Sequence, residues 1–127
     1  MTARRAPSDD HAAVESCVTD YFEAWFSADA ARMRRAVHPE LAKRGWIRRG
    51  AEAPFFDRDT SDSMVGFTTA GGGSKRPAAE HRFDIEVVDV RDDIASVTVR
   101  SPIYHEYLHL VRTDEGWRII HSLWRLA

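Results

Sequence analysis

Two histidines near the C-terminus, His109 and His121, are the residues of this sequence best suited to proton transfer, and one short turn separates them. If Thr113 pairs with Trp117 around a three-residue loop, the two imidazoles lie opposite each other on one face of a hairpin. A two-residue turn at Glu115-Gly116 instead places them on opposite faces. Facing neutral imidazoles serve as an acid and a base near neutral pH, so the pair is a candidate catalytic site. The alternative is a polar pair on a solvent or dimer face.

Three further side chains extend this candidate chemistry. Tyr107 shares strand parity with His109 and is a hydrogen-bond donor for a developing enolate, a role that Tyr21 also offers. His38 precedes a proline at the predicted end of a helix, where it either caps carbonyl groups or overhangs a pocket. Glu106 lies on a predicted strand, but its parity is opposite to that of Tyr107. The sequence therefore contains no unambiguous carboxylate base for the histidine face.

Aromatic residues are the candidate walls of a ligand pocket. The chain contains four Trp, three Tyr and six Phe, more than a minimal core needs. Tyr and Trp combine an apolar body with a hydrogen-bonding tip, which suits an aromatic or polycyclic ligand. The predicted ligand-binding residues are Tyr21, Trp25, Trp46 and Trp124. The alternative is a purely structural role, because aromatic residues at helical spacing are usually part of the core.

The sequence predicts no metal site and no cofactor. Cys17, the single cysteine, falls on the buried stripe of the first predicted helix and behaves as a small apolar residue. His105 and His109 share a strand face but lie about 13 Å apart, too far to bind one ion. The one glycine-rich run, 71–75, lacks the spacing of a phosphate-binding loop. Lys43 and Arg44 are candidates for an anionic ligand, although such a pair usually lies on a solvated surface.

Length and charge limit the classes of protein that this chain can form. Its 127 residues are 43% hydrophobic, enough for one domain with one core. The formal charge of −2 gives no field that favours nucleic acid as a partner. The apolar stretches are too short for a transmembrane helix or a signal peptide, so we expect a cytoplasmic protein without a membrane partner.

Helical periodicity dominates the first third of the chain. Ser8 is a candidate N-cap of a long amphipathic helix that extends through Trp25. Asp29 is the candidate N-cap of a second helix, which the dipeptide His38-Pro39 ends. A third, short helix begins near Ser61. The segment 41–47 has a weak pattern with a short strand near its end, and 54–56 resembles an apolar turn.

After a loop at 70–80, the spacing of apolar residues changes to a period of two. We expect this loop and residues 1–8 to be flexible. Adjacent Val87 and Val88 predict either a bulge or a strand that is apolar on both faces. Short turns join the strands, so they form an antiparallel meander. Helices followed by strands predict an α+β fold with helices packed on a curved, mainly antiparallel sheet. The predicted strands are 82–90, 94–103, 104–112 and 117–126.

This order of elements, with particular residues, resembles the nuclear-transport-factor-2-like superfamily, and most closely its "putative lumazine-binding" branch. The resemblance spans nearly the whole chain. The branch usually has an Asp where this chain has Glu106. The residues that carry the resemblance are Tyr21-Phe22-Glu23-Ala24-Trp25, Asp29 with Met33, Val37-His38-Pro39, and the C-terminal run Glu106–Val111 through Gly116–Ile120 to Leu123-Trp124.

The resemblance implies a cone-shaped fold with a blind pocket between the concave sheet face and the helices, with His38 near that pocket. It also implies a homodimer through the sheet. It does not imply one reaction, because relatives include isomerases, dehydratases, cyclases and binding domains. We expect a cofactor-independent acid/base enzyme of isomerase, dehydratase or cyclase type that acts on a small, largely apolar ring compound. The alternative is a ligand-binding or dimerisation module without turnover.

Overall fold

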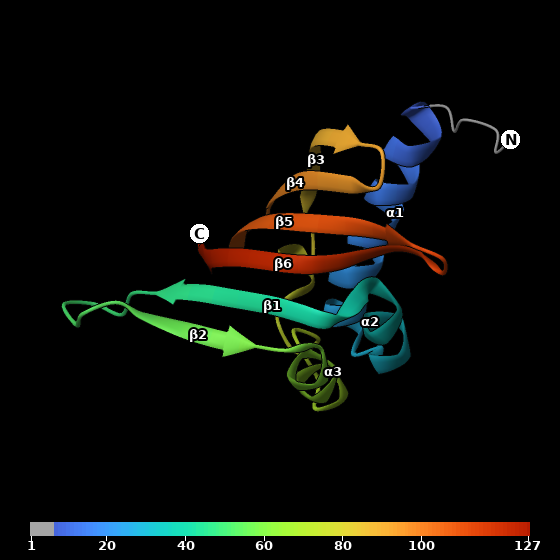
Figure 1. The fold of residues 1–127 in the computed structure, drawn as a ribbon. Coiled ribbons are helices and arrows are strands. Elements are labelled where there is room, and N and C mark those ends of the chain that lie inside the picture. The colour runs from blue at the N-terminus through green and yellow to red at the C-terminus, as the bar shows by residue number, and fades with distance from the viewer. Residues whose placement is uncertain (1–6) are drawn as a thin grey trace, which may run out of the picture.

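The computed structural model describes residues 7–127, and its helices cover one face of a curved sheet (Figure 1). No helix within these residues is long and apolar enough to cross a membrane. The helical elements are α1 (Pro7–Ser27), α2 (Ala30–Ala36), α3 (Ser61–Thr69) and the short 3-10 helix η1 (Ala78–Glu80).

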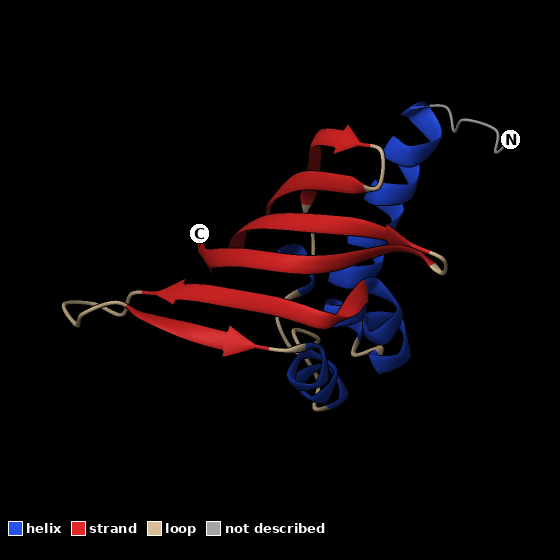
Figure 2. Ribbon diagram, in the orientation of Figure 1, coloured by secondary structure: helices blue, strands red, loops and turns tan. Residues whose placement is uncertain are grey.

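The sheet has six strands in the order β2-β1-β6-β5-β4-β3 (Figure 2). The last four strands form the predicted antiparallel meander, and only β1 and β6 pair in parallel within the described sheet. The predicted α+β fold with helices on a mainly antiparallel sheet is confirmed. The strands are β1 (Val37–Ile47), β2 (Phe55–Asp59), β3 (Asp84–Arg91), β4 (Ile94–Arg100), β5 (Tyr104–Thr113) and β6 (Gly116–Leu126).

The first helix is longer than predicted at its N-terminal end. It begins at Pro7, so Ser8 lies inside the helix and is not the residue before it. Proline is favoured in the first turn because its missing N–H would have no helical partner there. Of the segment 1–8 that we expect to be flexible, residues 1–6 lie outside the described part of the chain. The apolar stripe of α1 is buried as predicted, with Val14, Val18 and Phe22 at its centre.

The second helix begins at the predicted cap, because the Asp29 side chain accepts a hydrogen bond from the Arg32 backbone N–H at 3.1 Å. The chain after it differs from the prediction. His38-Pro39 lies inside the eleven-residue strand β1, and residues 55–59, predicted in part as a turn, form β2. The β1 pairing with β6 is irregular between Val37 and Ala42, where Pro39 has no N–H to donate. Sequence periodicity missed this strand because its partner β6 is distant in the chain.

The β5–β6 hairpin has a register that neither predicted turn describes. Thr113 pairs with Gly116 around a two-residue turn, which alone would set His109 opposite Ile120. An irregularity after His109 leaves Ile120 unpaired and brings His109 opposite His121. Of the two arrangements that the sequence leaves open, the structure has the one in which the histidines lie opposite each other, but a bulge produces it and not the turn. A second bulge, predicted at Val87 and Val88, is confirmed between β3 and β4.

Candidate functional site

A cavity of about 260 Å³ lies between the helices and the inner face of the sheet, close to the lower limit for pockets that bind small molecules. Its walls come from α1, α3 and the strands β1, β2, β5 and β6. The lining residues are Tyr21, Phe22, Trp25, Lys43, Asp57, Asp59, Met64, Phe67, Tyr104, Glu106 and Trp124. The cavity thus combines aromatic walls with a few ionisable groups.

A buried polar network forms one end of this cavity. Glu106 Oε2 accepts hydrogen bonds from the Tyr21 hydroxyl at 2.7 Å and the Ser122 hydroxyl at 2.6 Å. The Lys43 ammonium lies 3.4 Å from the same oxygen and also donates to the Tyr21 hydroxyl. The side chains of Lys43 and Glu106 are only 10% and 2% exposed. Buried charges persist in proteins when they are paired and hydrogen-bonded, as these are.

The strand pattern explains why these groups meet. Glu106 shares parity with Leu108 and Leu110, which are buried under the helices. Lys43 pairs in register with Ser122 across the parallel β1–β6 ladder, so both side chains reach the same face. Tyr21 lies on the buried stripe of α1, and its hydroxyl donates to Glu106. Three segments that are distant in the sequence therefore supply one network.

Burial fixes the protonation state of Tyr21. Desolvation raises the pKa of its hydroxyl well above 10.0, and the negative charge of Glu106 raises it further. The hydroxyl consequently stays protonated at neutral pH and donates to Glu106. This tyrosine is a hydrogen-bond donor within the cavity and not a base.

Aromatic rings form the walls above the network. The Trp25 indole N–H donates to the Tyr104 hydroxyl at 3.3 Å, and the Tyr104 ring meets Trp124 edge to face at 5.6 Å. The loop after α3 holds Trp25 in place, because the Gly73 backbone N–H donates to the Trp25 carbonyl at 2.9 Å. A Cβ on Gly73 would lie 2.7 Å from the Trp25 indole nitrogen. The glycine run therefore permits close packing against a cavity wall.

Gly45 permits close packing of Trp124, as Gly73 does for Trp25. A Cβ at this position would lie 2.5 Å from the Trp124 ring, closer than any real contact. The indole therefore lies flat over the β1 backbone at the residue with which it pairs in register. The Lys43 ammonium lies 5.6 Å from the centre of this ring, within cation–π range.

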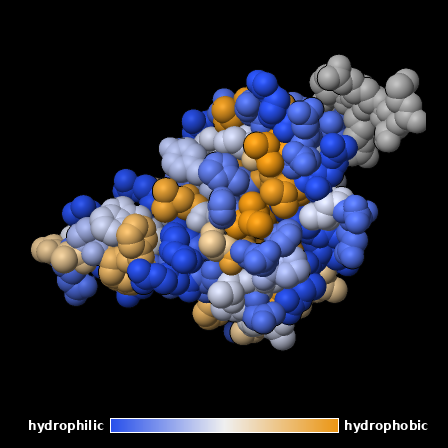
Figure 3. Space-filling model, in the orientation of Figure 1, coloured by the Kyte–Doolittle hydropathy of each residue, from blue (hydrophilic) through white to orange (hydrophobic). Residues whose placement is uncertain are grey.

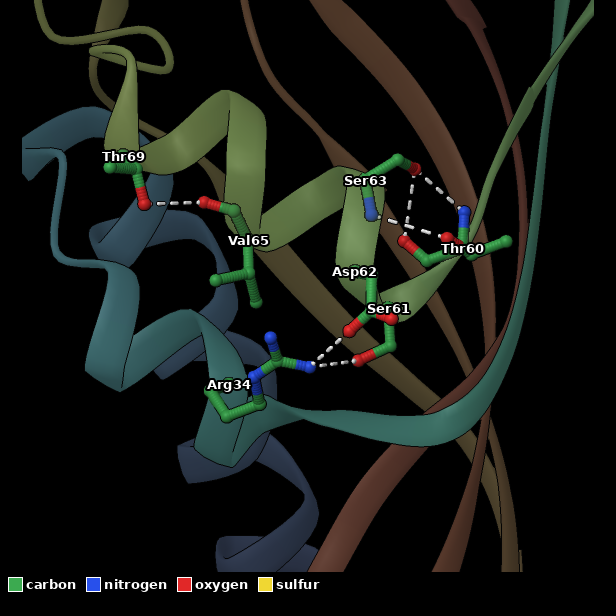
Figure 4. A network of polar contacts seen from close by, with 7 residues as sticks. All are labelled: Arg34, Thr60, Ser61, Asp62, Ser63, Val65 and Thr69. Atoms are coloured by element: carbon green, nitrogen blue, oxygen red, sulfur yellow. Dashed lines mark hydrogen bonds and ion pairs between the residues drawn. The ribbon is translucent and has the colours of Figure 1, made fainter.

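Helix α3 forms the remaining wall with Met64 and Phe67. Its N-terminus has a capping box, in which Thr60 and Ser63 exchange side-chain and backbone hydrogen bonds (Figure 4). Arg34 from α2 donates to Asp62 at 2.8 Å and to Ser61 at 3.2 Å. These contacts hold α3 against α2 and so fix one side of the cavity.

Two carboxylates of β2 line the cavity near Lys43. Asp59 pairs in register with Lys43, and Asp57 pairs with Gly45, so both side chains share the inner face. Asp59 is buried and accepts a hydrogen bond from the Ser63 hydroxyl at 2.8 Å. No ion pair joins Lys43 to Asp59 among the described contacts. The cavity therefore has a cationic group and a separate carboxylate on neighbouring strands.

The predicted histidine pair lies on the other face of the sheet. His109 and His121 are exposed, and their Nδ1 atoms lie 3.2 Å apart. They share parity with Tyr107, which is 53% exposed, and not with Glu106. Their catalytic role stays a prediction, and it cannot involve the inner cavity, because neither imidazole lines it.

The other predicted site residues divide between the two faces. Tyr21, Trp25 and Trp124 line the inner cavity. Trp46 instead contacts Phe56 on the outer face, with ring centres 4.7 Å apart, since its parity differs from that of Gly45. His38 accepts a hydrogen bond from the Glu40 backbone N–H at 3.0 Å through Nδ1 and does not line the cavity.

Sequence reasoning underrated Lys43 and Glu106 and did not consider Asp59. The signal for Glu106 was present, because its alternation with Leu108 and Leu110 places it on the helix-covered face. Lys43 was predicted only as one of two candidates for an anionic ligand, and no signal pointed to Asp59, since the register of β1 with both neighbours depends on tertiary pairing. Among residues 7–127, no group of three or more His, Cys, Asp and Glu could hold a metal ion.

Solved structures with the same fold cover nearly the entire chain. A nuclear-transport-factor-2-like protein of unknown function from Silicibacter pomeroyi has 18% identity and a TM-score of 0.79, with 97% of this chain and 100% of that chain covered. A similar protein of unknown function from Shewanella baltica has 11% identity and a TM-score of 0.74, with 98% of each chain covered. A third, from Methylobacillus flagellatus, has 15% identity and a TM-score of 0.68, with 100% and 98% covered.

At these identities the structures establish the fold alone, and no curated protein matches this chain. The family comparison goes further. The model of the family described as "Putative lumazine-binding" matches residues 9–125, which include α1 from Asp9 onward, the whole sheet except its final residue, and every residue of the cavity. The chain therefore belongs to this family, and it has the fold of the nuclear-transport-factor-2-like proteins.

Proposed function

We propose that the inner cavity binds a small ring compound whose oxygen accepts a hydrogen bond from Lys43. One observation carries this proposal. An ammonium group has three donors, and the network uses two of them, toward Tyr21 and Glu106. Lys43 also lines the cavity, so its third N–H is available to a ligand. A buried donor of this kind is stabilised when a ligand oxygen accepts from it.

The walls and the volume narrow the class of ligand. Trp25, Tyr104 and Trp124 surround the space with aromatic surface, and the cavity of about 260 Å³ has room for one or two rings. A flat heteroaromatic compound with carbonyl groups meets both requirements. Lumazine, after which the family is described, has two fused rings and ring carbonyl groups, so it is the first ligand to test.

The same groups support acid/base catalysis without a cofactor. Asp59 would remove a proton from the carbon next to a ring carbonyl; the C–H electron pair would form a C=C bond, and the carbonyl π pair would move to the oxygen. Lys43 would stabilise the resulting enolate, and Tyr21 would orient the ammonium group. Return of the proton from Asp59 to another carbon would complete an isomerisation. The site then needs only groups that this chain supplies.

A binding module without turnover is the second candidate function. It is favoured by the contacts of Glu106 Oε2, because three donors of the protein already surround this oxygen and leave it no free position toward a substrate. The position of His109 and His121 on the outer face also removes the imidazole pair from the cavity. The two candidates differ only in whether Asp59 transfers a proton.

Calorimetric titration with lumazine tests the binding proposal. Trp25→Phe shortens a cavity wall and Lys43→Met removes the donor, so we expect weaker binding by both variants. Trp46→Phe is the matched control, because this tryptophan lies on the outer face and its loss should leave binding unchanged. Equal affinity of wild type and Lys43→Met for lumazine and for related ring carbonyl compounds would contradict the proposal.

Proton exchange in D₂O tests catalysis separately. Cyclic ketones such as 2-cyclohexenone acquire deuterium next to the carbonyl group when an enolate forms, and NMR follows this exchange. We expect the wild-type protein to accelerate the exchange and Asp59→Asn to lose the acceleration while it retains binding. Binding of the ketones without accelerated exchange would favour the binding module.

We also propose that two copies pair through the outer sheet face. Trp46, Phe56, Tyr107 and Leu123 are each between 39% and 53% exposed, and hydrophobic residues form a band across the sheet (Figure 3). Such patches on a soluble domain usually mark an interaction surface. Sedimentation should show a dimer that Leu123→Glu converts to monomers. Monomers of the wild-type chain at micromolar concentration would contradict the pairing.

A further inference from the structure

A row of polar side chains crosses the outer face of the sheet. Asp89 pairs with Ser96, Ser96 pairs with His109, and His109 pairs with His121, so one residue from each of four adjacent strands shares the row. A hollow of about 360 Å³ covers this row. The hollow is separate from the inner cavity, because the two have no lining residue in common.

The two imidazoles are joined through their Nδ1 atoms by a hydrogen bond of 3.2 Å, so a metal ion bound there would replace the proton that they share. Zinc bound by histidine has Zn–N distances of about 2.0–2.1 Å, and in tetrahedral geometry two such ligands lie about 3.3 Å from each other. The separation of the two Nδ1 atoms is close to this value. We propose that His109 and His121 form a binding site for a divalent transition metal ion such as Zn²⁺.

The bulge at Ile120 builds this site. Without the extra residue, the hairpin turn would set His109 opposite Ile120 and point the His121 side chain to the other face. The bulge therefore converts a mismatched register into a facing pair of ligands. Sequence spacing alone could not establish this pair, since the register of β5 with β6 depends on the bulge.

The residues around the two histidines leave space for a bound ion and do not repel its charge. Asp89 and Arg91 both line the hollow, so their opposite charges leave no net repulsion of a cation from this pair. Two imidazoles fill two of four tetrahedral positions, and the hollow is open enough for water at the others. Cys17 does not compete for the ion, because it is buried on the inner side and burial raises its thiol pKa to about 12.

Titration of the untagged protein with ZnCl₂ by calorimetry tests the proposal. We expect saturable binding with one ion per chain, or one per two chains where a second copy supplies the remaining ligands. His109→Ala and His121→Ala should each weaken this binding by about tenfold or more, since even loss of an outer-shell partner costs this much. Both residues are exposed, so the variants should fold normally.

Co²⁺ provides a second readout that reports geometry. Tetrahedral coordination gives visible absorption bands, which we expect in the wild-type protein and not in either variant. His11→Ala is the matched control, because it removes an exposed histidine on α1 far from the sheet row and should change neither measurement. Zinc binding that is unchanged in His109→Ala and His121→Ala, or no saturable binding by the wild type, would overturn the proposal.

Discussion

Neighbouring residues of β5 belong to two different chemical environments. Glu106 and Leu108 face the helices and are 2% and 0% exposed, whereas Tyr107 between them is 53% exposed. On the inner face, a charged group persists only with a full set of partners, which Tyr21 and Ser122 supply to Glu106. On the outer face, water hydrates each polar group, so His109 needs no such set.

This difference changes what each face can do. The inner face excludes water and holds a fixed donor network, which suits selective binding of a small ring compound. The outer face leaves the nitrogens of His109 and His121 accessible to metal ions or to another copy of the chain. Alternation along a strand therefore gives one element two separate chemical environments, and the variants below test that separation.

Removal of the inner carboxylate should have the largest effect. Glu106→Ala leaves the buried Lys43 ammonium without its counter-charge, and breaking a buried pair in this way costs about 3–5 kcal/mol of unfolding free energy. Urea denaturation measures this loss. The control is Glu115→Ala, which removes an exposed partner of Arg118 and should cost less than about 1 kcal/mol. Similar losses of unfolding free energy in the two variants would contradict the expectation that a buried ion pair is costlier to break than an exposed one.

Alkaline pH should also destabilise the inner face. Burial raises the pKa of the Cys17 thiol from 9.0 to about 12. Below pH 9 the thiol is protonated in both states and has no effect, but at higher pH only the unfolded chain loses the proton. The native state should therefore lose roughly 2–3 kcal/mol by pH 11 through this group. Urea denaturation at pH 8 and pH 11 measures this loss of unfolding free energy, and we expect a smaller loss in Cys17→Ala. An equal loss in that variant would show that groups other than the Cys17 thiol cause the pH dependence.

Gly45→Ala should disturb the cavity wall at intermediate cost. The new methyl group would lie 2.5 Å from the Trp124 ring and force it to move, which typically costs about 1–3 kcal/mol. Gly66→Ala is the control, because its Cβ meets nothing within 4 Å on α3 and alanine favours helix. Thermal denaturation should show a lower Tm for the first variant and an equal or higher Tm for the second. A lower Tm for Gly66→Ala alone would contradict the structure.

Substitution of the outer histidines should have the smallest effect on stability. His109→Ala and His121→Ala change exposed side chains, so unfolding in metal-free buffer should shift by no more than about 0.5 kcal/mol. Lumazine affinity should also stay unchanged, because neither residue lines the inner cavity. Loss of lumazine binding in either variant would show that the two faces are coupled.

The helices and the meander could be predicted because their signals are local. Asp29 caps α2 as predicted, and the alternation of β5 and β6 defines two faces. The strand β1 was mostly missed, since Pro39 and Lys43 interrupt its apolar pattern and its partners lie far along the chain. For the same reason, the start of β2 is predicted as part of an apolar turn at 54–56.

The candidate site could be predicted only in part. Tyr21, Trp25 and Trp124 were identified because ring size and polar tips are properties of the residue itself. The face of the sheet on which a histidine lies depends on the register of its strand, and one unpaired residue moves the following side chains to the other face. The sequence therefore left open whether His109 and His121 oppose each other, and it did not determine which face they occupy.

The sequence by itself determined the class of fold and the helix-first order of elements, because periodicity and capping act within a few residues. Only the tertiary structure decided that Lys43, Tyr21 and Glu106 share one buried network while His109 and His121 lie in water. The physical reason is the period of the strand. A side chain has one of two faces, and long-range pairing, not local sequence, selects between them.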